Sequence, residues 1–178
     1  MGQSLSQPIG TLSGMPWEPG RHTVEYLLER GRLARLAPGG ADESADAILE
    51  RAGQRLATSR AALAGGDVHG SFVNAYDAYR MSAESLLARQ SLRATSGDGA
   101  HLAVEDAVSS QFAEQVEAFA KPTFDRFRRQ RHAAQYFDPS QPEVTEADAR
   151  WAIDPANNAL LQVRRLSESS DLGPFPSS

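Results

Sequence analysis

Residues 42–90 read DESADAILERAGQRLATSRAALAGGDVHGSFVNAYDAYRMSAESLLARQ, with apolar side chains at the three- and four-residue spacing of an amphipathic helix. The spacing is interrupted at the glycine pair 65–66, and glycines are typical of helix ends. Asp42 or Ser44 can cap the first helix, and the second begins at Asp67. Helices joined by so short a turn pack antiparallel, so the stretch predicts a helical hairpin.

More helices are predicted on both sides of this hairpin. They run from His22 to a break at 37–40, from His101 to Val116, from Thr123 to Phe137, and from a Thr145–Asp148 capping box to Leu166. Pro155 is expected to kink or split the last helix, with Asp154 as a fresh cap for its second half. No stretch of the sequence alternates at strand spacing. The predicted fold is all-α, an up-and-down bundle of about four to five helices with a short leading helix.

The two ends of the chain differ in composition from the middle. Residues 1–22 are rich in Pro, Gly and Ser, and residues 167–178 are rich in Ser and Pro. We expect a flexible N-terminal arm over 1–22, one helical domain over 23–166, and a disordered C-terminal tail over 167–178. A domain of this length can be stable without a disulfide or a structural metal.

The composition excludes several functional classes. The 178 residues include no Cys, which excludes iron–sulfur centres and thiol catalysis. The net charge of −5 argues against a protein that coats nucleic acid by charge alone. The histidines have no metal-ligand spacing and the sequence has no glycine-rich phosphate loop, so we expect neither a metal nor a cofactor. Without a long apolar run or a signal peptide, we expect a cytoplasmic protein that does not contact membranes.

Positive charge gathers in residues 124–136, which read FDRFRRQRHAAQY. On a helical wheel, Arg131 falls on the same stripe as Phe124 and Phe127, which are typical core residues. A guanidinium at such a position needs a carboxylate, a phosphate or a polar cleft, because an unpaired buried charge costs free energy. Arg126 and Arg129 point more toward solvent on the same wheel.

Two interpretations of this helix are open. In the first, Arg131 pairs with Asp77 or Glu84 of the hairpin, and the other arginines form a solvated basic face. In the second, the helix binds phosphate, because arginine offers two donors to one phosphate and histidine transfers protons near neutral pH. The side chains of such a site would be Arg128, Arg131, His132 and Tyr136.

Three segments together resemble a known family. They are Tyr76-Asp77-Ala78-Tyr79-Arg80, the loop and helix start from Leu92 to Val104, and Arg128-Arg129-Gln130-Arg131-His132-Ala133-Ala134-Gln135-Tyr136. In their order and spacing, residues 23–166 resemble a bacterial branch of the HEPN superfamily of small helical nucleotide-binding domains. The resemblance implies a helical bundle that forms homodimers in toxin–antitoxin or phage-defence modules. Active members are metal-independent ribonucleases, in which an arginine and a following histidine of both subunits share one cleft.

The family pattern can be carried over residue by residue. Arg131 best matches the family arginine, His132 stands where a polar residue usually follows, and Tyr136 stands where nucleolytic members place histidine. Other registers pair His132 with Arg126, or with Arg128 one helical turn before it. The catalytic candidates are therefore Arg126, Arg128, Arg131, His132 and Tyr136, and the candidates for binding RNA phosphate are Arg128, Arg129 and Arg131.

Three residues outside this helix are candidates for supporting roles. Asp77 and Arg80 are expected to form a structural ion pair with the arginine-rich helix. His101 either packs at the start of its own helix or reaches the cleft, because the family pattern includes the loop before it.

The sequence leaves three functions open. The first is a protein that acts on RNA, either a metal-independent endoribonuclease or a descendant that binds RNA or nucleotide without cutting it. The second is a non-enzymatic antitoxin, or the partner of a minimal nucleotidyltransferase that would modify Tyr136. The third is a structural dimerisation bundle in which the arginines serve the interface between subunits.

Overall fold

The protein is described by a computed structural model that covers residues 17–37, 39–97, 99–135, 143–169 and 172–176, with the backbone alone for 132–135. Its helices are α1 (Arg21–Glu29), α2 (Ala41–Ala64), α3 (Val68–Arg89), α4 (Ala100–Phe112), the short 3₁₀ helix η1 (Glu117–Phe119), α5 (Lys121–Gln135) and α6 (Glu146–Glu168). Two short strands, β1 (Leu33–Arg35) and β2 (Leu92–Ala94), accompany them. The predicted all-α bundle is confirmed.

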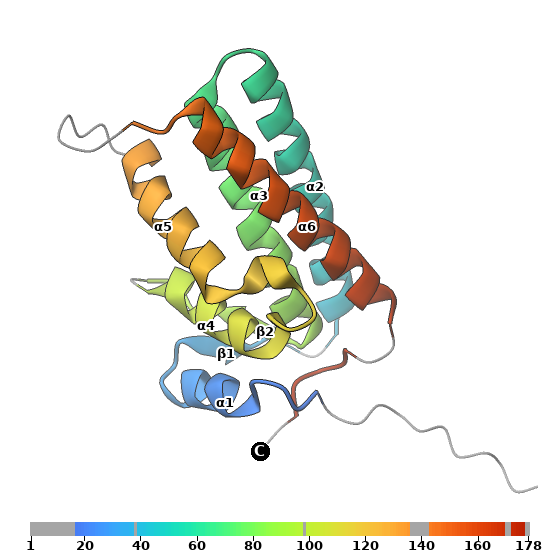
Figure 1. The fold of residues 1–178 in the computed structure, drawn as a ribbon. Coiled ribbons are helices and arrows are strands. Elements are labelled where there is room, and N and C mark those ends of the chain that lie inside the picture. The colour runs from blue at the N-terminus through green and yellow to red at the C-terminus, as the bar shows by residue number, and fades with distance from the viewer. Residues whose placement is uncertain (1–16, 38, 98, 136–142, 170–171, 177–178) are drawn as a thin grey trace, which may run out of the picture.

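Helix α3 lies at the centre of the bundle (Figure 1). Helices α2 and α6 pack along it, and α4 and α5 also contact it. This position follows from the sequence, because buried residues occupy several faces of α3, among them Phe72, Ala83 and Leu86. Asp67 caps α3 by accepting a hydrogen bond from Gly70 N at 2.8 Å, so the predicted hairpin and its second helix start are confirmed.

An aromatic cluster fills the space between α3, η1 and α5. Tyr79 is at its centre, and the ring centroids of Phe124 and Phe127 lie 4.9 and 4.5 Å from its own. Its hydroxyl donates to Ala118 O at 2.8 Å, which gives the buried phenol a partner. The two phenylalanines of α5 are those that the helical wheel directs into the core, and they fix how α5 is rotated about its axis.

Helix α6 begins as predicted and continues through Pro155. Thr145 and Asp148 form a capping box at its start. The expected split at Pro155, with Asp154 as a fresh cap, is wrong, because α6 is one helix over Glu146–Glu168. A proline removes a single backbone hydrogen bond from the helix. Buried alanines on both sides of it, Ala152 and Ala156, keep the two halves packed on the bundle.

The short strands differ from the prediction of a chain without strands. They pair antiparallel, with Leu33 opposite Ala94 and Arg35 opposite Leu92. Each strand is three residues long, which is too short for alternation to be recognised in the sequence. The leading helix was expected to continue past Leu33 but ends at Glu29, because Leu33 is buried as part of a strand.

Two further helix ends differ from the predicted ones. Helix α2 begins after Gly40, which has a φ of 78°, and neither Asp42 nor Ser44 is its cap. Helix α4 ends at Phe112 rather than Val116, because Val116 adopts an extended conformation and is buried before η1 begins.

The first described residues belong to the folded body. Trp17 stacks on Phe112 of α4 with ring centroids 5.1 Å apart, and α1 begins at Arg21. Residues 17–22 therefore contact the bundle through one large aromatic side chain, and the predicted flexibility of the arm stays a prediction. Residues 1–16 of the predicted arm lie outside the described residues.

The C-terminal segment is also packed on the bundle. Helix α6 extends to Glu168, and Leu172 and Phe175 are buried. The guanidinium of Arg35 donates to Phe175 O at 2.8 Å and to Pro176 O at 2.6 Å. The apolar side chains and carbonyl groups of residues 172–176 thus have partners near strand β1, and the predicted disorder of the tail stays a prediction.

Candidate functional site

Helix α5 brings Arg131 to the edge of the aromatic core. Phe124 and Phe127 are buried, and Arg131 follows on the same stripe, where it is half-buried. The guanidinium carbon of Arg131 lies 4.7 Å from the ring centroid of Tyr76, which is a cation–π contact. Its Nη1 atom lies 3.3 Å from Nε2 of His101. Arg131 thereby connects α5 with α3 and α4.

Arg131 has no carboxylate of the described residues within salt-bridge distance. The internal pairing with Asp77 or Glu84 that the sequence allows is not formed. Both acids lie next to Arg80 instead: Glu84 forms a short ion pair with its Nη1, and Asp77 Oδ1 lies 4.0 Å from its Nη2. A guanidinium has five N–H donors, so Arg131 has donors available for an anion from outside.

His101 stands at the second position of α4 and is a polar partner of Arg131. A guanidinium can only donate, so Nε2 of His101 accepts this hydrogen bond and Nδ1 carries the proton. Burial lowers the pKa of His101, and the charge of Arg131 lowers it further. The imidazole is therefore neutral near pH 7, and a neutral imidazole can accept a proton from a hydroxyl group.

Tyr76 forms the floor beneath Arg131. The residue is buried, and its ring centroid lies 5.7 Å from that of Phe127 and 6.5 Å from that of His101. Burial raises the pKa of Tyr76, although Arg131 and Arg80 oppose this effect. Tyr76 is thus a neutral stacking surface. The sequence predicts no role for Tyr76, although Tyr76 belongs to one of the segments that carry the family resemblance and directly precedes Asp77.

Asp77 and Arg80 form an ion pair within α3, not with α5 as the sequence analysis expects. Burial raises the pKa of the Glu84 carboxyl, and the neighbouring Arg80 opposes this effect. Arg80 also lines a narrow cleft of about 20 Å³ together with Tyr76 and His101. A cavity of this size holds about one water molecule.

Arg128 lies beside the same cleft but is paired with acids. Its Nη1 lies 3.1 Å from Glu105 Oε2, and its Nη2 contacts Asp125. Burial raises the pKa of Glu105, whereas the charge of Arg128 lowers it. This double pairing makes Arg128 less available to an external anion than Arg131.

The remaining arginines of α5 lie away from Arg131. The Arg126 guanidinium lies 3.8 Å from the ring centroid of Trp151 and 3.5 Å from Asp148 Oδ1, both in α6. Arg126 therefore faces α6 rather than bulk solvent as the wheel indicates. Arg129 is exposed. The side chain of His132 and the whole of Tyr136 lie outside the described residues, so their predicted roles stay predictions.

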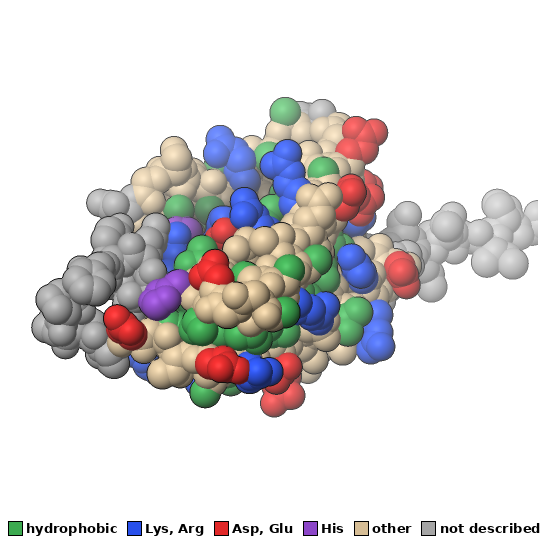
Figure 2. Space-filling model, turned by 90° about the horizontal axis from the view of Figure 1, so that it is seen from above, with side chains coloured by type: hydrophobic (Ala, Val, Ile, Leu, Met, Phe, Trp, Pro, Cys, Tyr) green, Lys and Arg blue, Asp and Glu red, His purple; other side chains and the backbone are tan. Residues whose placement is uncertain are grey.

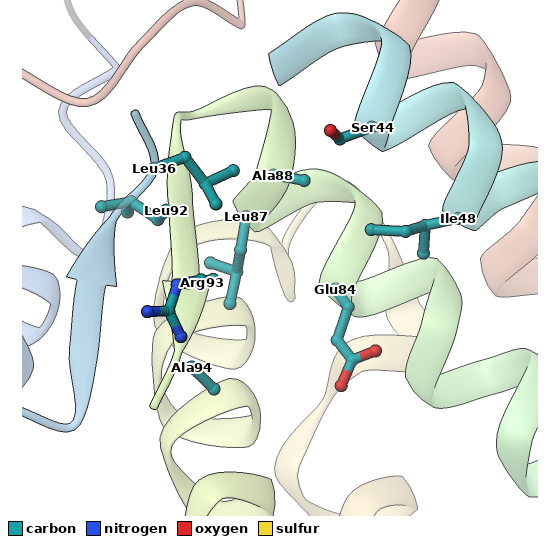
Figure 3. A pocket seen from close by; sticks show the side chains of 9 residues that line it. All are labelled: Leu36, Ser44, Ile48, Glu84, Leu87, Ala88, Leu92, Arg93 and Ala94. Carbon is teal, nitrogen blue, oxygen red and sulfur yellow. The ribbon is translucent and has the colours of Figure 1, made fainter. Parts of the chain in front are cut away.

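A larger cavity of about 270 Å³ lies farther along α3, between α2 and the strands (Figure 3). Leu36, Leu92 and Arg93 approach it from the strand side, and Ile48 faces them from α2 (Figure 3). Its lining is mainly apolar, with Ser44, Glu84 and Arg93 as the polar members.

Basic and acidic side chains are interspersed over the face of the molecule seen in Figure 2. This distribution agrees with the net charge of −5 and indicates that any anion would be bound by a local cluster rather than by the overall field. Within the described ranges, no three His, Cys, Asp or Glu side chains gather in a way that could hold a metal ion. Among the helices described, none combines the length and the apolar character that crossing a membrane requires.

Comparison of the chain with protein-family models, with curated proteins and with solved structures found no match. The resemblance to the HEPN superfamily therefore rests on the three sequence segments alone, and the function has to be argued from the site.

Proposed function

We propose that the protein binds the phosphodiester backbone of RNA at Arg131, as a HEPN-like member of a toxin–antitoxin or phage-defence module. The observation that supports this function is the environment of Arg131. Its guanidinium lies against Tyr76 and His101, without a carboxylate of the described residues as its counter-ion. Arginine in such a position can bind a phosphate through two donors. The choice of RNA comes from the family resemblance.

Cleavage without a metal ion is the chemistry that we propose for this site. The ribose 2′-hydroxyl attacks the adjacent phosphorus, which gives a 2′,3′-cyclic phosphate and releases the 5′-oxygen of the next nucleotide. The guanidinium of Arg131 turns from His101 to the phosphate, which frees Nε2 of His101 to accept the hydroxyl proton, and the imidazolium can return a proton to the leaving oxygen. Arg131 stabilises the negative charge that develops on the phosphorane oxygens. In the homodimer that the resemblance implies, a second copy of the site would share the cleft.

Incubation of the purified protein with RNA in excess EDTA tests this chemistry. We expect Arg131→Gln and His101→Ala to lower the cleavage rate by roughly a hundredfold or more, because each removes a group that acts in the transition state. Arg60→Gln is the matched control, because Arg60 is also an exposed arginine but lies on α2, outside the candidate site. Intact RNA with the wild-type protein would show that the site does not cleave, and cleavage insensitive to Arg131→Gln would show that the site lies elsewhere.

A further inference from the structure

A second polar groove runs between α2 and α3, next to Arg80. Its volume is about 460 Å³. Helix α2 contributes the first four lining residues and α3 the last three: Arg51, Gln54, Arg55, Thr58, Asp77, Arg80 and Met81. Three guanidinium groups line the groove with one carboxylate. Arg80 is paired with Asp77 and with Glu84 beside the groove, so the local positive charge of the groove comes from Arg51 and Arg55.

The two arginines of α2 are not neutralised within the described structure. Neither Arg51 nor Arg55 has a carboxylate of the described residues within salt-bridge distance. Arg89, in contrast, pairs with both Asp42 and Asp46 between the same two helices. The groove therefore keeps the positive charge of two exposed arginines, whereas the charge of Arg89 is paired with two carboxylates.

Arg51 and Arg55 lie next to each other on the same face of α2. They are four residues apart on α2, so they lie on one face with Cβ atoms about 5–6 Å apart. Nη1 of Arg55 donates to Asn74 Oδ1 of α3 at 3.1 Å, which directs its guanidinium toward α3 without cancelling its charge. Two cations at this spacing can contact different phosphates of one strand.

Arg80 joins the groove to the Arg131 site. It lines both the groove and the narrow cleft that contains Tyr76 and His101. Its Nε atom is buried and has no hydrogen-bond partner among the described residues. A chain bound at Arg131 can therefore pass Arg80 and continue between α2 and α3.

We propose that the α2–α3 groove binds the phosphodiester backbone of single-stranded nucleic acid that flanks the Arg131 site. This inference rests on the proposed function, because it requires that the strand be bound at Arg131. The groove binds backbone charge rather than a base sequence, since three of its seven lining residues are arginines.

Fluorescence anisotropy with labelled oligonucleotides of about 12 and about 3 nucleotides tests the groove, with 2′-O-methyl RNA so that the strand is not cleaved during the measurement. We expect the double variant Arg51→Gln/Arg55→Gln to bind the long RNA about tenfold more weakly and the short RNA as the wild type does. The dependence of log K on log salt should fall by about 1.4, which is twice the roughly 0.7 per phosphate of a single strand. DNA of the same sequence should lose affinity by the same factor.

Arg60→Gln is the matched control. Like Arg55, Arg60 is exposed on α2 and donates to an amide oxygen, Asn157 Oδ1 at 2.8 Å, but it does not line the groove. If the double variant binds the long RNA with wild-type affinity while Arg131→Gln binds it more weakly, the proposed role of the groove is overturned and the proposed function is not. Unchanged binding by Arg131→Gln would overturn the proposed function. No binding of either oligonucleotide by the wild-type protein would overturn both, and an equal loss with Arg60→Gln would reduce the groove to general surface charge.

Discussion

The arginines of α5 differ in role because each meets a different neighbour. Arg126 lies over Trp151, and Arg128 is held by two acids, whereas Arg131 lies against Tyr76 and His101. The helical wheel predicts that Arg131 shares the stripe of the core phenylalanines. It could not predict His101 as its partner, because His101 lies 30 residues away on another helix and the wheel describes one helix at a time.

The contact between His101 and Arg131 leads to a prediction about proton binding. We expect His101 to titrate below the ordinary histidine pKa of 6.5, because burial and the charge of Arg131 both disfavour the imidazolium. Arg131→Gln should raise this pKa, and Arg129→Gln should leave it unchanged. NMR titration of the histidine ring protons measures both effects. A pKa of His101 above 6.5 in the wild-type protein would contradict the contact.

The same shift makes the stability of the fold depend on pH. Because its pKa is lower in the folded state, His101 binds a proton more readily when the chain is unfolded. Its contribution to stability is therefore present above the unfolded value of 6.5 and is lost as the pH falls toward the folded pKa. We expect the urea midpoint to decrease between about pH 7 and about pH 5, and His101→Gln to reduce this decrease.

At the scale of elements, a buried amide pair connects the end of α3 with α4. Gln90 Nε2 donates to Gln111 Oε1 at 2.7 Å, and Gln111 Nε2 donates to Gln90 Oε1 at 3.1 Å. Both side chains are almost completely buried. The sequence offers no signal for this pair, because a glutamine near a helix end is usually exposed.

Gln111→Met should destabilise the protein by about 1–3 kcal/mol, because the buried amide of Gln90 loses its partner. The double variant Gln90→Met/Gln111→Met should recover part of this loss, because no orphaned amide remains. Urea unfolding of the two single variants and the double variant measures the coupling. Strictly additive changes in unfolding free energy would contradict the reciprocal hydrogen bonds.

The composition of the C-terminal tail, residues 167–178, does not indicate that residues 172–176 pack on the bundle. Its serines and prolines favour disorder, but Phe175 is buried and its backbone N–H donates to Gln90 O at 2.9 Å. The short strands were missed for a related reason, since they are defined by partners distant in sequence. By contrast, the long helices and the capping box of α6 are local features, and the sequence predicts them.

Phe175→Ala should destabilise the protein, by at most the about 3–5 kcal/mol typical of a buried phenylalanine. The loss should be smaller than this limit because the segment can detach without unfolding the bundle. Hydrogen exchange should show faster exchange at residues 172–176 and near Arg35, with α2 and α3 unaffected. Loss of protection throughout α2 and α3 would contradict a locally docked segment.

At the scale of the whole molecule, the bundle follows from its central hairpin. The apolar spacing of residues 42–90 predicts two long helices, and the many buried faces of α3 place it at the centre. The sequence does not predict which polar side chains of different helices contact each other. The candidate site depends on such contacts. Side chains of α3, α4 and α5 come together at Arg131, and side chains of α2 and α3 line the groove.

Binding of RNA phosphate by Arg131 is tested by the affinity of the wild-type protein, Arg131→Gln and Arg60→Gln for single-stranded 2′-O-methyl RNA, which cannot be cleaved through its 2′-oxygen. We predict that Arg131→Gln weakens binding about tenfold or more, because a charge-assisted contact of roughly 1.5–3 kcal/mol is lost, while Arg60→Gln has a much smaller effect. Equal affinities of the three proteins, or no measurable binding by the wild type, would contradict the account.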